Sequence, residues 1–140
     1  MQTIQSLMTA NPACCQAKTP LAEVARLMKE NDCGQIPVVD SLQRPVGVVT
    51  DRDIALRIVG AARNPTQCCA SDAMTAPART IGLDADIGEG ISLMESLQIR
   101  RLPVVDASGA LAGMLSIADI AQCAKPAQTA EVIKEVSQRR

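Results

Sequence analysis

The sequence predicts a mixed α/β fold of the α+β type, built from two copies of one β-α-β-β-α unit. When the sequence is moved by 66 residues, Met8 falls on Met74 and the two halves match without a gap. Within each half, short apolar segments alternate with segments whose apolar residues recur at helical spacing. The chain has 140 residues, which is enough for a domain of ordinary size with a core of its own.

The match between the halves is carried by four segments that occur in the same order twice. They are MTANP and MTAPA, LAEVARLM and IGEGISLM, IPVVD and LPVVD, and GVVTDRDIA and GMLSIADIA. A fixed period of this kind is typical of a repeated structural unit. We therefore expect repeat 1 with its N-terminal segment over residues 1–65, repeat 2 over residues 66–125 and a helical tail over residues 126–140.

Each repeat is expected to start with an extended piece and a helix. The extended pieces are residues 13–16 and 79–83. The helix of repeat 1 has an apolar stripe at positions i, i+3, i+4 and i+7, and repeat 2 keeps most of it. The stripe residues, which we expect in the core, are Leu21, Val24, Ala25, Met28, Ile87, Ile91 and Met94.

Two strands and a second helix complete each repeat. IPVVD and LPVVD are expected to be short buried strands, with Pro37 and Pro103 at their entrances, where no ladder amide is needed. A turn with the sequence SLQRP or ASGAL follows each of them. The second strands, residues 46–49 and 111–115, then lead into the last helix of each repeat.

Two further segments join or follow the repeats. ARNPTQCCASD is expected to be the connection between them. The tail from Thr129, TAEVIKEVSQRR, has a capped helical start and an apolar edge of Val132, Ile133 and Val136. This edge either pads the domain or pairs with a second chain.

The composition argues against several classes of function. The chain has no Phe, Tyr, Trp or His, so the commonest general base and metal ligand are missing, and we expect no catalytic residues. A net charge of -1 and a pI near 5.4 argue against a broad nucleic-acid-binding surface. No apolar run is long enough to span a membrane, and MQTIQSLM does not have the pattern of a secretory signal, so we expect a cytoplasmic location.

The cysteines allow two interpretations. The two adjacent pairs among them do not have the spacing of a zinc site, and the sequence has no histidine to complete one. The functional interpretation is a thiolate metal site or a redox pair. We prefer small apolar core residues in a reducing compartment, and we expect no metal. The six cysteines are Cys14, Cys15, Cys33, Cys68, Cys69 and Cys123.

The segment GVVTDRD and its counterpart in repeat 2 allow two interpretations as well. Thr50 can cap a helix by accepting a hydrogen bond from the N3 amide, and an acid such as Asp53 at N3 suits the positive end of the helix dipole. The alternative is a sugar site, because a carboxylate accepts hydrogen bonds from ribose hydroxyls in dinucleotide-binding folds. Taken alone, the segment favours the cap. Ser116 and Asp119 repeat the same step in the second half.

These paired motifs resemble the CBS-domain pair, which is named after the repeats of cystathionine β-synthase and is also called the Bateman module. The hydrophobic-Pro-Val-Val-Asp strand and the Gly-x-x-Thr/Ser-x-x-Asp step carry the resemblance, and each occurs twice. The resemblance covers Met8 to about Cys123. It implies two β-α-β-β-α units packed through their sheets with pseudo-twofold symmetry, and two clefts between them that bind adenosine-containing ligands.

The resemblance also implies which residues form the two clefts. The aspartate accepts from the ribose hydroxyls, and the Ser or Thr lies near the sugar or the phosphate. Aliphatic side chains sandwich the adenine, because the chain has no aromatic ring to stack on it. The first cleft is expected to hold Thr50, Asp53 and Val48 with Thr80, Ile81, Leu102 and Pro103. The second is expected to hold Ser116, Asp119 and Met114 with Cys14, Cys15, Gln35, Ile36 and Pro37.

Arg100 and Arg101 distinguish the two clefts. Two guanidiniums at a cleft mouth can clamp phosphate oxygens, and the alternative is a solvated basic pair at a helix end. We assign this pair to the cleft of Asp53. The matching residues of repeat 1 are the uncharged Gly34 and Gln35, so we expect the cleft of Asp53 to bind nucleotide better.

The sequence therefore predicts a regulatory module that senses AMP, ADP or ATP, with S-adenosylmethionine as a further candidate ligand. It is expected to require no cofactor, to form a homodimer and to act on a downstream effector that the sequence does not identify. Two other functions stay open. One is a structural dimerisation module without a ligand, and the other is a redox or metal sensor built on the cysteines.

Overall fold

The computed structural model describes residues 3–123 and residue 136, and these belong to two compact units. Pro12–Arg79 is the first unit, and Met1–Asn11 together with Thr80–Arg140 is the second. The start of the chain thus groups with repeat 2, while the bounds of the sequence repeats themselves stay a prediction. Val136 is buried, whereas Val132, Ile133 and the rest of the expected tail helix lie outside the described residues.

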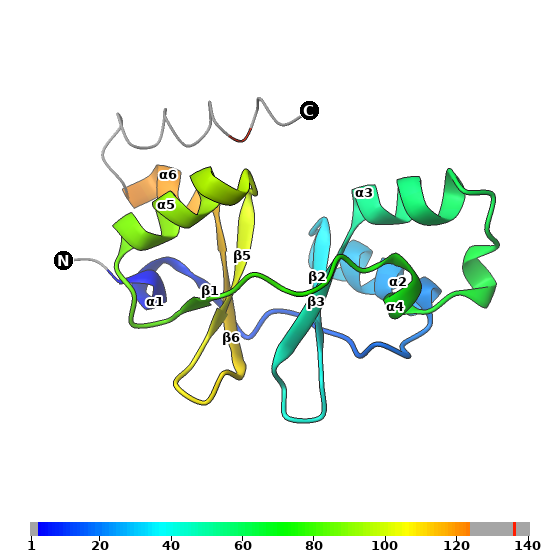
Figure 1. Ribbon diagram of the computed structural model, residues 1–140, viewed down its shortest axis with the longest axis horizontal. Helices are drawn as coiled ribbons and strands as arrows, with labels where there is room; N and C mark the ends of the chain where they lie inside the picture. Colours follow the sequence, from blue (N-terminus) through cyan, green and yellow to red (C-terminus); the bar gives the residue numbers. More distant parts are fainter. Residues whose placement is uncertain (1–2, 124–135, 137–140) are drawn as a thin grey trace. The chain divides into compact units, whose positions relative to one another are not determined.

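The first unit contains one antiparallel strand pair and several helical segments (Figure 1). In the pair, Gln35 faces Thr50 and Pro37 faces Val48. η1 is a π-helical segment that continues α3 directly, and η2 is a single 3-10 turn. The elements are α2 (Leu21–Asn31), β2 (Gln35–Val39), β3 (Pro45–Thr50), α3 (Asp51–Asp53), η1 (Ile54–Val59), η2 (Pro65–Gln67) and α4 (Ala70–Ala73).

The second unit contains a four-stranded sheet in the order β1-β6-β5-β4, with helices beside it (Figure 1). β4 and β5 are parallel, and the other two pairs are antiparallel. The elements are α1 (Ile4–Leu7), β1 (Thr9–Ala10), β4 (Ile81–Gly82), α5 (Ile87–Leu97), β5 (Arg101–Val105), β6 (Leu111–Ser116) and α6 (Ile117–Cys123). The mixed α/β prediction is confirmed.

Each unit is completed by a short segment that precedes the other repeat in the sequence. Thr9 of β1 pairs with Met114 of β6, and Thr75 pairs in the same way with Val48 of β3. Thr75 and Val48 exchange both backbone hydrogen bonds, at 2.8 and 3.0 Å. The two MTA steps of the sequence are therefore crossing segments that make equivalent contacts in the two units.

A glycine that recurs in the two repeats, Gly47 on β3 and Gly113 on β6, permits this close approach. A Cβ on Gly113 would lie 2.5 Å from Met8 Sδ and 2.8 Å from the carbonyl oxygen of Thr9. A Cβ on Gly47 would lie 2.8 Å from Met74 Sδ. Because both glycines face a crossing segment, the repeat of Gly in the motif has a steric cause.

Both units have cores made only of aliphatic and sulfur-containing side chains among the described residues. The apolar stripes predicted for α2 and α5 face these cores, with one exception. Ala25 is exposed, because α2 buries the narrower i, i+3, i+7 stripe. The other stripe residues are buried or half-buried, namely Leu21, Val24, Met28, Ile87, Ile91 and Met94.

The prolines were predicted at the entrances of their strands, and this prediction is wrong. Pro37 lies inside β2 rather than at its entrance, and it faces Val48. The carbonyl of Pro37 accepts the N–H of Cys15 at 3.0 Å, on the side away from β3, and Val48 bonds Thr75. Pro37 and Val48 are therefore a non-hydrogen-bonded pair, so the missing proline N–H breaks no bond to β3.

The segment expected as a plain connection, residues 62–72, contains η2 and the start of α4. Cys69 caps α4 together with Asp72, whose Oδ2 accepts the N–H of Cys69 at 2.8 Å. Arg63 donates to the other oxygen of Asp72 at 3.2 Å. Local capping thus folds the connection onto the first unit.

Candidate functional site

The Thr-x-x-Asp step of the first unit lies where β3 ends and α3 begins. Thr50 is the last residue of β3, and its Oγ1 accepts the N–H of Asp53 at 3.0 Å. Asp53 Oδ2 in turn accepts the N–H of Thr50 at 3.0 Å. This reciprocal pair is a capping box. The cap interpretation of GVVTDRD is therefore confirmed.

The second unit repeats this geometry at the end of β6. Ser116 Oγ accepts the N–H of Asp119 at 3.1 Å, and Asp119 Oδ2 accepts the N–H of Ser116 at 2.9 Å. Both side chains are half-buried. Each aspartate thus has one oxygen fixed by the cap, and the other oxygen decides whether it can also bind a ligand.

The remaining oxygens of the two aspartates differ in their partners. Asp53 Oδ1 accepts the hydroxyl of Thr75 at 3.2 Å and lies 3.9 Å from Arg57 Nε. Among residues 3–123, Asp119 Oδ1 has neither a hydrogen bond nor an ion pair. Since each carboxylate oxygen has two lone pairs, both aspartates keep acceptor capacity for further donors.

Arg57 is a residue near this step that the sequence motifs missed. It stands four residues after Asp53, and this i, i+4 spacing of opposite charges on a helix was the available signal. Its Nη1 donates to the carbonyl of Met74 at 2.8 Å, and its Nη2 lies 3.5 Å from Thr75 Oγ1. Arg57 therefore ties η1 to the crossing segment beside the carboxylate.

Within each unit, two of the apolar residues expected around adenine face each other across the strand pair that ends at the capped step. In the first unit Pro37 faces Val48, and in the second Pro103 faces Met114. The sequence interpretation assigned the two members of each such pair to different clefts. Cys15, Ile36, Ile81, Leu102 and both prolines are buried, and Cys14, Gln35 and Thr80 are half-buried.

Each of the two predicted clefts combines the aspartate of one unit with the hydrophobic-Pro residues at the start of the PVVD strand of the other unit. The structure brings together the residues of each unit separately, as described above. The joining of these half-sets into two adenosine clefts stays a prediction.

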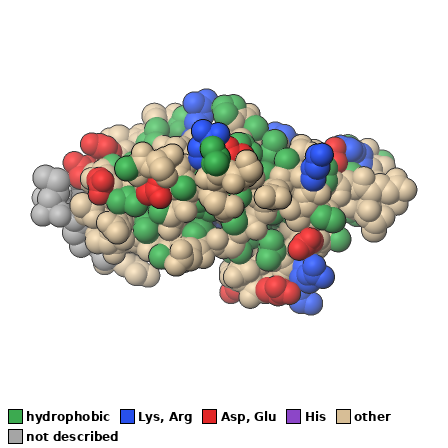
Figure 2. Space-filling view, turned by 90° about the horizontal axis from the view of Figure 1, so that it is seen from below, with side chains coloured by type: hydrophobic (Ala, Val, Ile, Leu, Met, Phe, Trp, Pro, Cys, Tyr) green, Lys and Arg blue, Asp and Glu red, His purple; other side chains and the backbone are tan. Residues whose placement is uncertain are grey.

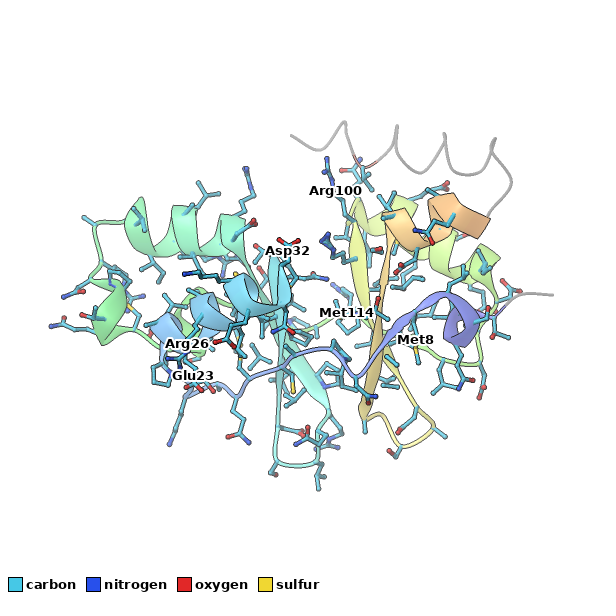
Figure 3. The ribbon with its side chains drawn as sticks, turned by 180° about the vertical axis from the view of Figure 1, so that it is seen from behind. Met8, Glu23, Arg26, Asp32, Arg100 and Met114 are labelled. Atoms are coloured by element: carbon cyan, nitrogen blue, oxygen red, sulfur yellow. The ribbon has the colours of Figure 1, made fainter. Side chains whose placement is uncertain are left out.

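Arg100 and Arg101 are exposed at the start of β5, where Figure 3 labels Arg100. Arg101 faces Ser116 across the strand pair, and the carbonyl of Arg100 accepts the N–H of Ile117 at 3.0 Å. Directly opposed residues of an antiparallel pair have their side chains on the same face. Arg101 therefore lies next to Ser116 of its own unit.

The first unit has a different charge at the equivalent place. Gln35 faces Thr50, and the carbonyl of Gly34 accepts the N–H of Asp51 at 2.9 Å. Asp51 aligns with Ile117 of repeat 2, so the first unit has a carboxylate where the second has an apolar side chain. A Cβ on Gly34 would lie 3.0 Å from Asp51 Oδ2. The start of β2 in the first unit thus has the uncharged Gly34 and Gln35 beside the acidic Asp51. The start of β5 in the second unit is basic.

Cys14 and Cys15 of the first unit are poor thiolates. Burial raises the pKa of Cys15 to about 11, with smaller contributions from Cys14 and Glu23, and burial also raises the pKa of Cys14. Raised pKa values disfavour the thiolate, which is the form that binds metals and attacks disulfides. Within residues 3–123 there is no group of three or more His, Cys, Asp or Glu arranged to hold a metal ion.

Figure 2 shows acidic and basic side chains distributed among neutral ones over the face it presents. In the described part of the chain, no helix has the length and apolar character needed to cross a membrane.

Comparison with known proteins gives the same family twice along the chain. The sequence model of the CBS domain matches residues 4–60 and 70–125. YlbB of Bacillus subtilis is 38% identical over 121 residues, which are 86% of this chain and 80% of YlbB. Hypoxic response protein 1 of Mycobacterium tuberculosis is 31% identical over 122 residues, which are 87% of this chain and 85% of that protein.

A further relative is longer than the match. The uncharacterized protein MK0525 of Methanopyrus kandleri is 36% identical over 100 residues, which are 71% of this chain and 51% of MK0525. The chain therefore spans about half the length of that relative.

Solved structures resemble this chain over most of its length. Hypoxic Response Protein I, solved with two coordinated zinc ions, is 30% identical with a TM-score of 0.80 and covers 89% of this chain and 100% of its own. CBSX2 in complex with AMP is 24% identical with a TM-score of 0.77 and covers 89% of this chain and 97% of its own. The CBS domain pair of MJ0100, in complex with 5'-methylthioadenosine and S-adenosyl-L-methionine, is 20% identical with a TM-score of 0.76 and covers 87% and 94%. The last two similarities establish the fold alone.

Proposed function

The chain belongs to the CBS-domain family, and from this premise we propose that it is a regulatory module that binds an adenine nucleotide. AMP, ADP and ATP are the proposed ligands, with S-adenosylmethionine as a further candidate of the same chemical class. The observation that carries the proposal is the repeated step at Thr50–Asp53 and Ser116–Asp119. In both units a capped aspartate uses one oxygen in the cap and keeps acceptor capacity for ribose hydroxyls.

The bound ligands of related structures support an adenosine-containing ligand. CBSX2 was solved with AMP, and the CBS domain pair of MJ0100 with 5'-methylthioadenosine and S-adenosyl-L-methionine. All three ligands contain an adenine and a ribose, so the aspartate step is the part of the proposal that they share. The choice among phosphorylated and unphosphorylated ligands depends on the cations near each step.

The proposed binding mode places the ligand in two clefts between the units. Asp53 and Thr50 hold the ribose of one ligand, and Asp119 and Ser116 hold that of the other. The adenine of each lies between the apolar residues that the sequence assigned to the two clefts. Ligand binding then regulates by favouring one arrangement of the units over others, because a ligand shifts an equilibrium only through differential affinity.

The module is proposed to have no catalytic residues of its own and to act on a partner. Its candidate partners are a second copy of the chain, in a homodimer, and a downstream effector. We place its action in the cytoplasm. A structural dimerisation module without a ligand and a cysteine-based sensor are the alternatives that the first experiment separates from it.

The experiment that tests the proposal uses the lack of Trp and Tyr in the chain. Such a protein absorbs very little in the near ultraviolet, so a copurifying adenine nucleotide is visible in the spectrum of the purified protein. Calorimetric titration of the stripped protein with AMP, ATP and S-adenosylmethionine should then give a saturable signal for at least one ligand. Flat titrations with all three, together with a flat spectrum, would refute nucleotide binding and favour the dimerisation module or the thiol sensor.

A second test addresses phosphate recognition by Arg100 and Arg101. Replacing both, in Arg100→Ala with Arg101→Ala, should weaken AMP or ATP far more than adenosine, because charge-assisted hydrogen bonds to phosphate are lost. The measurement is the ratio of the AMP and adenosine dissociation constants. An equal loss for both ligands would mean that the pair does not contact phosphate.

A further inference from the structure

The proposed ribose site of the first unit has a cation on its helix that belongs to neither CBS motif. Arg57 follows Asp53 by about one helical turn, and its Nε lies 3.9 Å from Asp53 Oδ1. Nη1 donates to the carbonyl of Met74 at 2.8 Å, and Nη2 lies 3.5 Å from Thr75 Oγ1. The guanidinium is thus held beside the carboxylate by the crossing segment.

The guanidinium keeps binding capacity in this position. Of its five N–H donors, only the one on Met74 makes a short hydrogen bond to a residue that the structure describes, and the contact with Thr75 is at the limit of hydrogen bonding. The side chain of Arg57 is 50% exposed, whereas that of Asp53 is 14% exposed. Its outer donors are therefore open to an anion that approaches Asp53 from the solvent.

A ribose held by Asp53 would bring such an anion to this place. The 5'-phosphate of a nucleotide is attached to the same sugar whose hydroxyls donate to the carboxylate, so the phosphate stays close to Asp53. Without a cation, the carboxylate and the phosphate would repel each other. Arg57 offsets this repulsion and can donate to the phosphate oxygens.

The second unit places its positive charge on a different element. The residue that aligns with Arg57 is Cys123, and Asp119 has no ion pair within residues 3–123. Among residues 3–11 and 80–123 of this unit, the basic residues are instead Arg100 and Arg101, at the start of the strand that faces Ser116. The strand entrance of the first unit, where Gly34 and Gln35 are uncharged and Asp51 is acidic, is thus accompanied by a cation on the helix.

We propose that Arg57 is a specificity-determining residue of the first unit, which makes the Asp53 site prefer phosphorylated adenosine ligands to adenosine. The inference rests on the proposed function, because it requires Asp53 to hold a ribose. It adds a ligand-contacting role to a residue whose contacts in the structure tie η1 to the crossing segment.

The test compares AMP with adenosine by calorimetry in three variants. Arg57→Gln keeps a donor for the carbonyl of Met74 but removes the charge, and Arg57→Lys keeps the charge. Arg26→Gln is the matched control: Arg26 lies on α2 of the same unit, where Figure 3 labels it, and its Nε is 4.0 Å from Glu30 of an exposed i, i+4 pair. Thermal denaturation of each variant verifies that it is folded.

In Arg57→Gln, AMP should bind about fivefold more weakly, which corresponds to about 1 kcal/mol, while adenosine affinity changes by less than about twofold. Arg57→Lys should keep most of the preference for AMP, and Arg26→Gln should keep all of it. Added salt should weaken AMP binding in the unsubstituted protein more than in Arg57→Gln.

Three results would overturn the inference, and they are distinguishable. If Arg57→Gln weakens AMP and adenosine equally, or leaves both unchanged, Arg57 has only a structural role, and the proposed function stands. If Arg57→Gln does not fold, Arg57→Lys takes its place: a folded Arg57→Lys protein without any preference for AMP overturns the inference, because its positive charge is retained. If the unsubstituted protein binds neither AMP nor adenosine, the proposed function fails and the inference fails with it.

Discussion

Asp53 and Asp119 combine two roles through the two oxygens of one carboxylate. In each residue Oδ2 closes a capping box with the preceding Thr50 or Ser116. Capping and ribose binding are therefore compatible, because the cap leaves Oδ1 and part of the capacity of Oδ2 for other donors. A substitution that removes the carboxylate disturbs both roles, so a test of ribose binding has to preserve the cap.

Asp53→Asn separates the two roles. The amide oxygen of Asn can still accept the N–H of Thr50, so the helix start is preserved, but the negative charge that strengthens hydrogen bonds from ribose hydroxyls is lost. Nucleotide affinity should fall by about 1–3 kcal/mol, measured by calorimetry.

Asp72→Asn is the control for Asp53→Asn. Asp72 has the same position in the capping box of α4, where its Oδ2 accepts the N–H of Cys69, but no ligand role is proposed for it. The melting temperatures of the two variants should fall by comparable amounts, and nucleotide affinity should fall only in Asp53→Asn. Unchanged affinity in Asp53→Asn would leave this residue as a helix cap.

At the scale of elements, the turn after each PVVD strand is organised by the aspartate that ends the motif. Asp106 Oδ1 accepts the hydroxyl of Ser108 at 2.6 Å and the N–H groups of Ser108 and Ala110 at 2.9 and 3.1 Å. Asp40 holds the equivalent turn through the N–H groups of Leu42 and Arg44. The final Asp of the motif thus has a local structural cause.

Because of these turns, the stability of the folded protein should fall in the acidic pH range. The hydroxyl of Ser108, with the nearby N–H groups, holds the pKa of Asp106 below its usual value. A lowered pKa means that the stabilisation is present above the pKa of the unfolded chain, about 3.9, and is lost as the pH falls through the lower folded value. Ser108→Ala removes the largest cause, so its melting temperature should fall less steeply than that of the unsubstituted protein on acidification below about pH 5. Identical slopes would contradict this assignment.

The contacts of β6 and β3 with their crossing segments can be tested by adding one methyl group to the glycine of the strand. In Gly113→Ala the new Cβ would lie 2.8 Å from the carbonyl oxygen of Thr9, which is backbone and cannot move without breaking the β1–β6 pairing. We expect a loss of about 1–3 kcal/mol in the free energy of unfolding, measured in urea.

Gly82→Ala is the matched control for that substitution. Gly82 also lies on a strand of the second unit, but a Cβ there has no atom within 4 Å. It should change the free energy of unfolding by less than about 0.5 kcal/mol. Equal stability of Gly113→Ala and Gly82→Ala would mean that β1 does not pack against β6 in solution.

The elements that the sequence predicted well are those with a local pattern. The helices α2 and α5 have a regular apolar spacing, and the PVVD strands are continuous apolar runs, so their position follows from nearby residues. The crossing segments were missed, because the sequence contains no sign that Thr9 pairs with Met114 rather than with its own repeat. The i, i+4 pair of Asp53 and Arg57 was also missed, although its spacing is visible in the sequence.

At the scale of the whole molecule, the repeat predicted the family and the number of units but not how the chain divides between them. The sequence repeats follow each other without a gap, whereas the first 11 residues belong to the unit formed by residues 80–140. Such a division depends on long-range pairing, which a periodic pattern does not report. The same holds for the candidate clefts, since each of them combines residues of both repeats.

The proposed homodimer can be tested on the exposed apolar side chains of η1, in the first unit. Leu56 and Val59 are 57% and 63% exposed, and both lie on η1. A dimer that pairs through its helices would be stabilised by burial of these side chains. Leu56→Glu should therefore raise the dimer dissociation constant, by about tenfold or more if one leucine side chain is buried in the contact.

Sedimentation equilibrium of the unsubstituted protein, Leu56→Glu and Leu42→Glu decides this point. Leu42 is 64% exposed, more than Leu56, but it lies in the turn between β2 and β3 and not on a helix, so its substitution should leave the dimer intact. A protein that is monomeric without any substitution would refute the homodimer. A loss of the dimer in Leu42→Glu but not in Leu56→Glu would place the contact on the strand turns, and the helices would then be free for the downstream effector.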